Sequence, residues 1–327
     1  CSSDLVRRAG QKLRLTVQLI DADSGHHLWA DHYDGEMADV FDLQDRIVGR
    51  IVGEISPSVR AAEITRARLK RPDSLQAYDY LLRAQPGFQS ILDPGHAEAI
   101  ELFHKAIELE PGYALAMALA AWGHAQRFHR LMSVDINSDR RQANELANRA
   151  LALSPDDPSV LLAAGQALLM AGGEEYAYRI AFLFRKALAL DPNSAPGWRR
   201  LGGLHIHRLE PAEAIEAFER ALRLSPLDPM SFYARQGIGE AHLIAGRLEE
   251  SLRFHQQALS ERPRDHLLRR RVCALLALGG EIEQARRMVG EILADQPHLT
   301  LELMASNSRP TPQRDITFKG LRLAGFP

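Results

Sequence analysis

Six prolines recur at the ends of six amphipathic segments, and their spacing constrains this chain more than any other feature. The gaps between them are 44, 37, 34, 37 and 34 residues. A recurring period of this size is typical of folds in which each unit buries its apolar face against the next unit. The spacing predicts a helical solenoid, a class that binds more often than it catalyses. The six residues are Pro111, Pro155, Pro192, Pro226, Pro263 and Pro297.

Composition excludes several other classes of protein. The 327 residues are 46% hydrophobic, which is enough for a continuous core. With 40 basic and 42 acidic residues, the chain has no overall charge that would attract nucleic acid or an anionic membrane. Two cysteines exclude a disulfide framework. The longest nearly apolar run, residues 113–122, is about half of the ~20 residues that cross a bilayer, so we expect no membrane segment within the chain.

The unit that ends at Pro226 has the clearest internal pattern. Small residues allow its two helices to pack closely, and aromatic residues fill the gaps between units. This pattern resembles the tetratricopeptide repeat, a helix pair with a period of about 34 residues. The resemblance implies a mainly α-helical solenoid with a concave groove lined by the first helix of each pair. The signature residues are Trp198, Leu201, Gly202, Ala214, Phe218, Ala221 and Pro226.

The same pattern divides most of the chain into about six helix pairs. Surplus residues fit turns within the second and third pairs, at 131–140 and at Gly172-Gly173. Asp157 and Asp228 each precede a proline and are predicted N-caps. Residues 298–327 are predicted to be a capping segment and tail, in which 299–305 cover the last apolar face. The predicted pairs are residues 75–111, 112–155, 156–192, 193–226, 227–263 and 264–297.

The N-terminal segment, residues 1–57, has a different pattern. Apolar and polar residues alternate over 12–20, and a second short strand over 27–33 completes a predicted β-hairpin. Helical spacing follows over residues 40–55. A hairpin with one helix is too small to be stable alone, so we expect part of a larger α/β domain. Residues 58–74, rich in arginine, are predicted to form a basic linker helix.

Several stretches of this segment support a resemblance to a known domain. Residues 6–10, 18–22, 27–31 and 41–45 resemble the second half of the bacterial TolB-like N-terminal domain. Residues 1–5 have no evident role, and their codons can match the end of a short-read sequencing adapter. We therefore expect residues 1–5 to be a sequencing artefact that precedes a truncated reading frame.

No catalytic, cofactor or metal site is expected. His205 and His207 lie two positions apart on a predicted helix, so they point to different faces. No glycine-rich phosphate loop follows a strand, and no nucleophile has a recognisable base. Aspartates 21, 23, 31 and 34 border turns, where local hydrogen bonding is their usual role.

The predicted functional site is the groove face of the first helices. Its arginines favour an acidic protein or peptide, because guanidinium groups bind carboxylates through two parallel hydrogen bonds. We expect no nucleic acid as a ligand of this chain, and the oligomeric state stays open. The predicted partner-binding residues are Arg199, Tyr233, Gln236, Glu240 and Arg270.

The order of these segments, together with the ending at 318–327, resembles the C-terminal half of bacterial signalling proteins that carry a class III adenylate/guanylate cyclase domain. This resemblance implies a non-catalytic regulatory module whose parent is the enzyme. One alternative is the same module in a winged-helix transcriptional regulator, and another is an enzyme with its site in the TolB-like remnant. We expect a cytoplasmic location, or a periplasmic one if a membrane segment precedes residue 1 in the parent.

Overall fold

The fold is known from a computed structural model of the chain. It describes residues 2–9, 12–20, 25, 27–36, 59, 62–65, 67, 75–89, 95–129, 132–171, 177–226, 228, 230–306 and 310–327. The predicted helix over 40–55 and the Gly172-Gly173 turn lie outside these ranges. Of the predicted linker helix, residues 59, 62–65 and 67 are described, and they are helical.

The N-terminal part is an antiparallel sheet of three strands in the order β1 (Ser2–Ala9), β2 (Lys12–Ile20) and β3 (His27–Glu36). The predicted hairpin is confirmed as β2 and β3. Strand β1 was not predicted, because its residues do not alternate and its conformation depends on backbone pairing with β2. Arg14 pairs with Asp34 across β2 and β3 at 2.6 Å.

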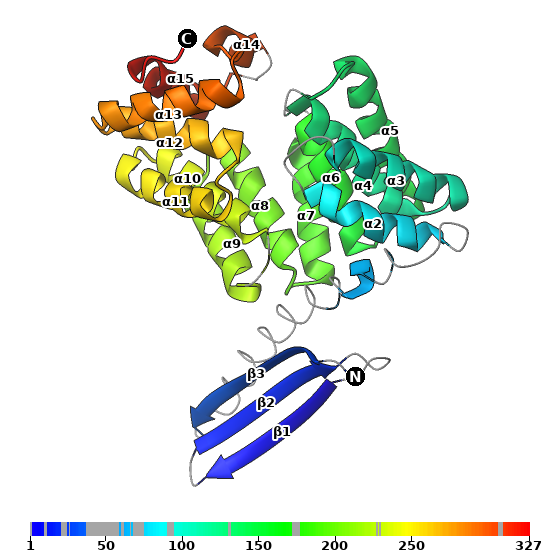
Figure 1. The fold of residues 1–327 in the computed structure, drawn as a ribbon. Coiled ribbons are helices and arrows are strands. Elements are labelled where there is room, and N and C mark those ends of the chain that lie inside the picture. The colour runs from blue at the N-terminus through cyan, green and yellow to red at the C-terminus, as the bar shows by residue number, and fades with distance from the viewer. Residues whose placement is uncertain are drawn as a thin grey trace.

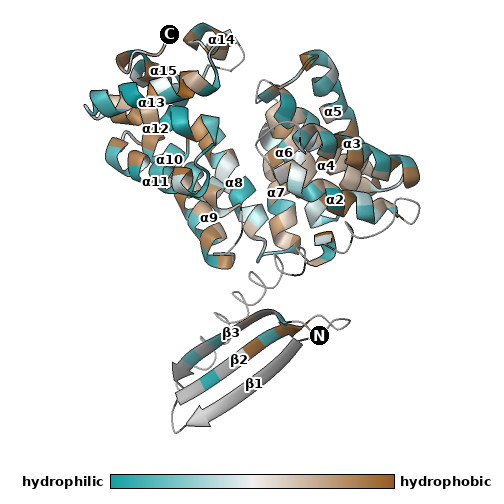
Figure 2. Ribbon diagram, viewed as in Figure 1, coloured by the Kyte–Doolittle hydropathy of each residue, from teal (hydrophilic) through white to brown (hydrophobic). Residues whose placement is uncertain are grey.

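The predicted solenoid of six helix pairs is confirmed, and consecutive pairs stack along the chain (Figure 1). Apolar and hydrophilic residues alternate around the helices, as expected when one side of each faces a core (Figure 2). The pairs are α2 (Ala77–Gln89) with α3 (Gly95–Leu109), α4 (Ala114–His129) with α5 (Ile136–Leu153), α6 (Pro158–Ala171) with α7 (Ala177–Leu190), α8 (Ala195–His207) with α9 (Pro211–Leu224), α10 (Ser231–Ile244) with α11 (Leu248–Glu261), and α12 (His266–Leu278) with α13 (Ile282–Asp295).

The signature residues of the fourth pair make the contacts that their types predict. A Cβ atom at Gly202 would lie 2.9 Å from the ring of Phe218, and one at Gly237 would lie 2.2 Å from the same ring. Phe218 of α9 is thus packed between α8 and α10 and is only 3% exposed. Glycine at both positions is what allows one ring to join two successive pairs.

Side chains at the turns set where several helices begin. Asp157 caps α6 as predicted, because its carboxylate accepts the backbone N–H of Ser159 at 2.8 Å. The prediction for Asp228 was wrong in detail. Helix α10 begins at Ser231, and Asp228 instead closes the preceding turn by accepting the Met230 N–H at 2.8 Å.

Two further helices follow the last pair: α14 (Leu301–Ser306) and α15 (Pro312–Leu323). The predicted cap at 299–305 contributes buried Leu299 and Met304. Helix α15 and the residues after it, which were expected to be a tail, also pack against the last pair. Their buried apolar residues are Phe318, Leu321, Ala324 and Phe326.

None of the helices in the described ranges is long and apolar enough to cross a membrane.

Ala221→Glu tests the packing of the fourth pair. Ala221 is 5% exposed on α9, so the new carboxylate would be buried without a partner. We expect the free energy of unfolding to fall by about 3 kcal/mol or more in urea titrations. Ala212→Glu, at an exposed position in the first turn of the same helix, should change it by less than about 0.5 kcal/mol. Equal losses in both variants would contradict this packing.

Candidate functional site

All five predicted partner-binding residues lie on first helices. We call the surface formed by the first helices α2, α4, α6, α8, α10 and α12 the first-helix face. Arg199 lies on α8, Arg270 lies on α12, and the other three residues lie on α10. Tyr233 stacks in a tilted arrangement on Phe232, with ring centroids 4.1 Å apart, and Gln236 is half-buried.

Arg199 already has a carboxylate partner within the chain. Its Nη1 lies 3.0 Å from Oδ2 of Asp228, and the two side chains are only 10% and 17% exposed. The same carboxylate closes the turn before α10. Arg199 therefore joins the fourth and fifth pairs, and an acidic ligand would have to compete with Asp228 for it.

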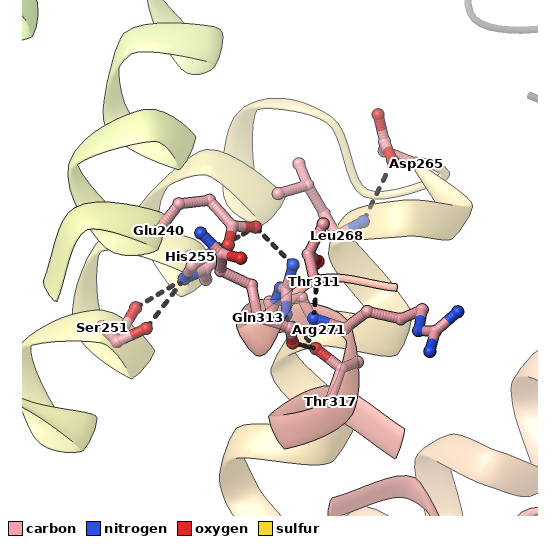
Figure 3. Close-up of polar contacts among 10 residues, drawn as sticks. Glu240, Ser251, His255, Asp265, Leu268, Arg271, Thr311, Gln313 and Thr317 are labelled. Carbon is pink, nitrogen blue, oxygen red and sulfur yellow. Dashed lines mark hydrogen bonds and ion pairs between the residues drawn. The ribbon is translucent and has the colours of Figure 1, made fainter. Parts of the chain in front are cut away.

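Glu240 is held between two cationic or ionisable groups (Figure 3). Its Oε1 lies 2.6 Å from Nη2 of Arg271 and 3.5 Å from Nε2 of His255. Burial acts to raise the pKa of Glu240, but Arg271 and His255 outweigh it and lower the pKa to about 2. Glu240 is thus a neutralised anion that connects α10 with α11 and α12.

His255 occupies the position on α11 that Phe218 occupies on α9. It is fully buried, and its Nδ1 donates to the backbone carbonyl of Ser251 at 2.7 Å. A Cβ at Gly239 would lie 2.4 Å from that imidazole. The histidine therefore packs like an aromatic residue and also supplies a polar edge toward Glu240.

Arg200 differs from its neighbours because no described carboxylate lies within ion-pair distance of it. Its guanidinium lies over the ring of Trp122 at 4.0 Å, and its Nε has no hydrogen-bond partner. Burial, reinforced by the charge of Arg199, lowers the pKa of Arg200 to about 9. Arg200 is not among the predicted partner-binding residues, because nothing in the local sequence signals its contact with Trp122, which lies two pairs earlier.

Arg270 resembles Arg200 in this respect. Within the described ranges no carboxylate pairs with it, and burial lowers its pKa. Arg269 and Arg271 beside it are both paired, with Asp295 and Glu240 respectively. The first-helix face thus contains two half-buried arginines that form no ion pair with a described carboxylate.

A second polar cluster lies between α3, α4 and α5. His124 Nδ1 lies 2.7 Å from Asp139 Oδ1, its Nε2 lies 3.0 Å from Nε2 of His104, and Ser133 donates to Asp139 at 2.5 Å. Burial and the neighbouring His124 lower the pKa of His104. Ser133 contacts the carboxylate and not an imidazole, so the cluster lacks the serine–histidine contact of an activated nucleophile. It joins three helices.

The described residues contain no group of three or more histidine, cysteine or acidic side chains arranged to hold a metal ion. His205 pairs with a carboxylate and not with a second histidine: its Nδ1 lies 2.6 Å from Oε2 of Glu210. Cys273 is buried and donates to the carbonyl of Ala285 at 3.4 Å.

Comparison with known proteins agrees with the helix-pair geometry. A family model described as tetratricopeptide repeat matches residues 183–229 and 210–266, which include the clearest pair and its neighbour. The matched residues form tetratricopeptide repeats, and the six helix pairs together have the fold of a tetratricopeptide-repeat solenoid. The six pairs are therefore called repeats one to six.

Curated relatives include "Putative adenylate cyclase 3" of Rhizobium meliloti (strain 1021), 34% identical over 113 residues. This match covers 35% of the chain and 19% of that protein. "Cellulose synthase operon protein C" of Xanthomonas axonopodis pv. citri is 28% identical to the chain over 251 residues. That match covers 73% of the chain and 15% of the Xanthomonas protein. The chain thus spans less than a fifth of either relative. The TolB-like resemblance of the N-terminal segment gains no support from these matches.

Solved structures confirm the repeat fold. The APC/C hetero-tetramer Cut9–Hcn1 matches 81% of the chain and 48% of the compared chain, with a TM-score of 0.57 and 16% identity. The structure of human IFIT1 with m7Gppp-AAAA matches 67% of the chain and 50% of the IFIT1 chain, with a TM-score of 0.57 and 13% identity. Identities this low show the fold alone.

Glu240→Gln tests the electrostatics of this face. The pKa of Glu240 in the fold is below its ordinary value of 4.5, so its ionised form stabilises the fold above pH 4.5 and this contribution is lost as the pH falls toward 2. We expect the variant to be less stable than the wild type by about 3 kcal/mol at pH 7, and the difference to shrink below pH 4.5. Urea unfolding at pH 7, 4 and 3 measures it.

Glu291→Gln is the matched control for this experiment. Glu291 also faces an arginine, Arg269, at 3.5 Å, but its side chain is 67% exposed. Its substitution should change stability little at any of the three pH values. A loss in Glu240→Gln that stays constant between pH 7 and pH 3 would contradict the role of the ionised carboxylate.

Proposed function

We propose that this chain is a non-catalytic interaction and regulatory module that binds an acidic partner protein on its first-helix face. The observation that carries the proposal is Arg200, a half-buried arginine whose buried Nε has no hydrogen-bond partner and whose guanidinium has no described carboxylate within ion-pair distance. A buried charge is costly unless it is paired. A carboxylate from a partner would supply the missing charge and two parallel hydrogen bonds.

The distribution of charge on the face supports this direction of recognition. Arg199 and Glu240 form ion pairs within the chain, whereas no described carboxylate lies within ion-pair distance of Arg200 or Arg270. Tyr233 and Gln236, which lie on α10 between these two arginines in the sequence, offer a ring and an amide for further contacts. The unneutralised charge is positive, so a ligand with carboxylates fits better than a basic one.

The parent protein is proposed from similarity. A bacterial relative with a cyclase name and the TolB-like resemblance of residues 1–57 support a parent that carries an N-terminal adenylate cyclase domain. Partner binding on the repeats would then be transmitted to that domain in the cytoplasm. A winged-helix regulator is the alternative parent, and an enzyme with its site in residues 1–57 is the second alternative. The gene sequence upstream of residue 6 distinguishes a cyclase domain from a winged helix.

Arg200→Leu tests the acidic partner site. The probe is a fluorescein-labelled octaglutamate peptide, whose binding is measured by fluorescence anisotropy. We expect the dissociation constant to rise about tenfold or more in Arg200→Leu, because a hydrogen bond to a charged group contributes about 1.5–3 kcal/mol. Arg270→Leu should also raise the dissociation constant of the peptide.

Arg220→Leu is the matched control. Arg220 also lies over a tryptophan, Trp198, at 4.4 Å, but it is exposed on the second helix α9. Its loss should leave the affinity unchanged. If Arg200→Leu and the wild type bind the peptide equally well, the acidic site is wrong.

RNA is the competing ligand class, because the IFIT1 structures of similar fold contain RNA. Guanidinium groups also bind phosphates, so the peptide experiment needs an RNA arm. A short adenylate RNA with a 5′-triphosphate should bind the wild-type chain more weakly than the acidic peptide. Tighter RNA binding that is lost in Arg200→Leu would overturn the protein-partner assignment. In a separate assay, the chain supplied with ATP and Mg²⁺ should form no cyclic AMP.

A further inference from the structure

The C-terminal helix α15 covers part of the first-helix face. It packs against α12 and, over a smaller contact, against α10, both of which are first helices. Its buried residues Phe318 and Leu321 share a cluster with Val272 and Leu276 of α12. The chain end is also tied down, because the carbonyl of Pro327 accepts the backbone N–H of Leu301 at 2.7 Å.

One close approach places α15 on this face. A Cβ atom at Gly320 would lie 2.3 Å from the backbone carbonyl oxygen of Ala274. Ala274 follows Arg270 by four residues, so the two lie on the same side of α12. The absence of a side chain at Gly320 is what lets the two helix backbones meet there. Helix α15 therefore occupies, within this chain, surface that adjoins the proposed partner site.

The described polar contacts between α15 and the helices α10 and α12 are hydrogen bonds made by Arg271. Arg271 donates to the backbone carbonyl of Gln313 at 2.9 Å and to the hydroxyl of Thr317, while its Nη2 pairs with Glu240 (Figure 3). Among the described residues, no ion pair joins α15 to α10 or α12. If α15 left, Arg271 and Glu240 would still neutralise each other, so no buried charge would be orphaned.

We propose that the first-helix face of repeats five and six is a helix-binding site that α15 occupies in cis, and that an amphipathic helix of the partner protein replaces it. The contacts of α15 define the ligand: a small residue over Ala274, apolar residues on the same side, and a hydroxyl near Arg271. This proposal rests on the proposed function only in assigning partner binding to the first-helix face.

Gly320→Val in the full chain tests the exchange. The valine would collide with the Ala274 carbonyl and weaken the docking of α15 in cis, which leaves its site open to a competitor in trans. The probe is a labelled peptide of residues 310–327 with the native Gly320. We expect Gly320→Val to bind the peptide about tenfold or more tightly than the wild type, because the internal competitor is weakened. A peptide that itself carries the valine should not bind.

Gly290→Val is the matched control, since Gly290 also lies within a helix but a Cβ atom there would have no neighbouring atom within 4 Å. This control should bind the peptide no better than the wild type. Equal binding by the two variants, or no binding by Gly320→Val, overturns the proposal. The peptide carries three basic residues and one acidic residue. Its binding is therefore independent of the acidic-ligand experiment, and either proposal can fail alone.

Cys273 distinguishes displacement of α15 from unfolding of the sixth repeat. It is buried and donates to Ala285 of α13, so it reports on the α12–α13 contact. In a Cys1→Ser background, Cys273 of Gly320→Val should stay unreactive toward a thiol reagent. Rapid labelling would show that α15 is part of the repeat core, which contradicts exchange. Sedimentation should show a monomer; a dimer that exchanges α15 would identify a second copy, and not a partner, as the occupant.

Discussion

The array depends on one recurring contact, in which a ring from the second helix of a repeat lies against a first-helix residue without a side chain. Phe184 lies against Gly165, Phe218 against Gly202, and His255 against Gly239. In each case a Cβ atom would come closer to the ring than real Cβ atoms do. The contact sets the distance between the two helices, and through Gly237 it also joins repeat four to repeat five. First helices consequently line up as one face.

The charges on that face follow from this alignment. Arg199 and Asp228 join repeats four and five, and Glu240 and Arg271 join repeats five and six, so each ion pair connects neighbouring repeats. Two of the five predicted partner-binding residues, Arg199 and Glu240, are therefore already in ion pairs within the chain. The same stacking leaves Arg200 over Trp122 without a carboxylate. The ion pairs that join the repeats and the proposed partner site therefore use different arginines of the same helices.

The sequence predicted the repeats well because the relevant contacts are local. Trp198, Gly202 and Phe218 lie within one unit, and their spacing alone specifies how the two helices meet. The candidate site was predicted less completely. Its residues were assigned to the correct helices, but the ion pairs of Arg199 and Glu240 join residues roughly thirty positions apart. Helix α15 was interpreted as a tail, since short polar stretches around residue 310 interrupt the repeat period.

By itself, the sequence determined the class of fold, the order of the helix pairs and the hairpin of β2 and β3, because periodic apolar residues and turn prolines act over a few residues. The tertiary structure decided which charges are neutralised, that Ser2–Ala9 adds a third strand, and that α15 lies on the face of α12 and α10. These outcomes depend on backbone pairing and on side chains from distant repeats, which meet only after the helices have stacked.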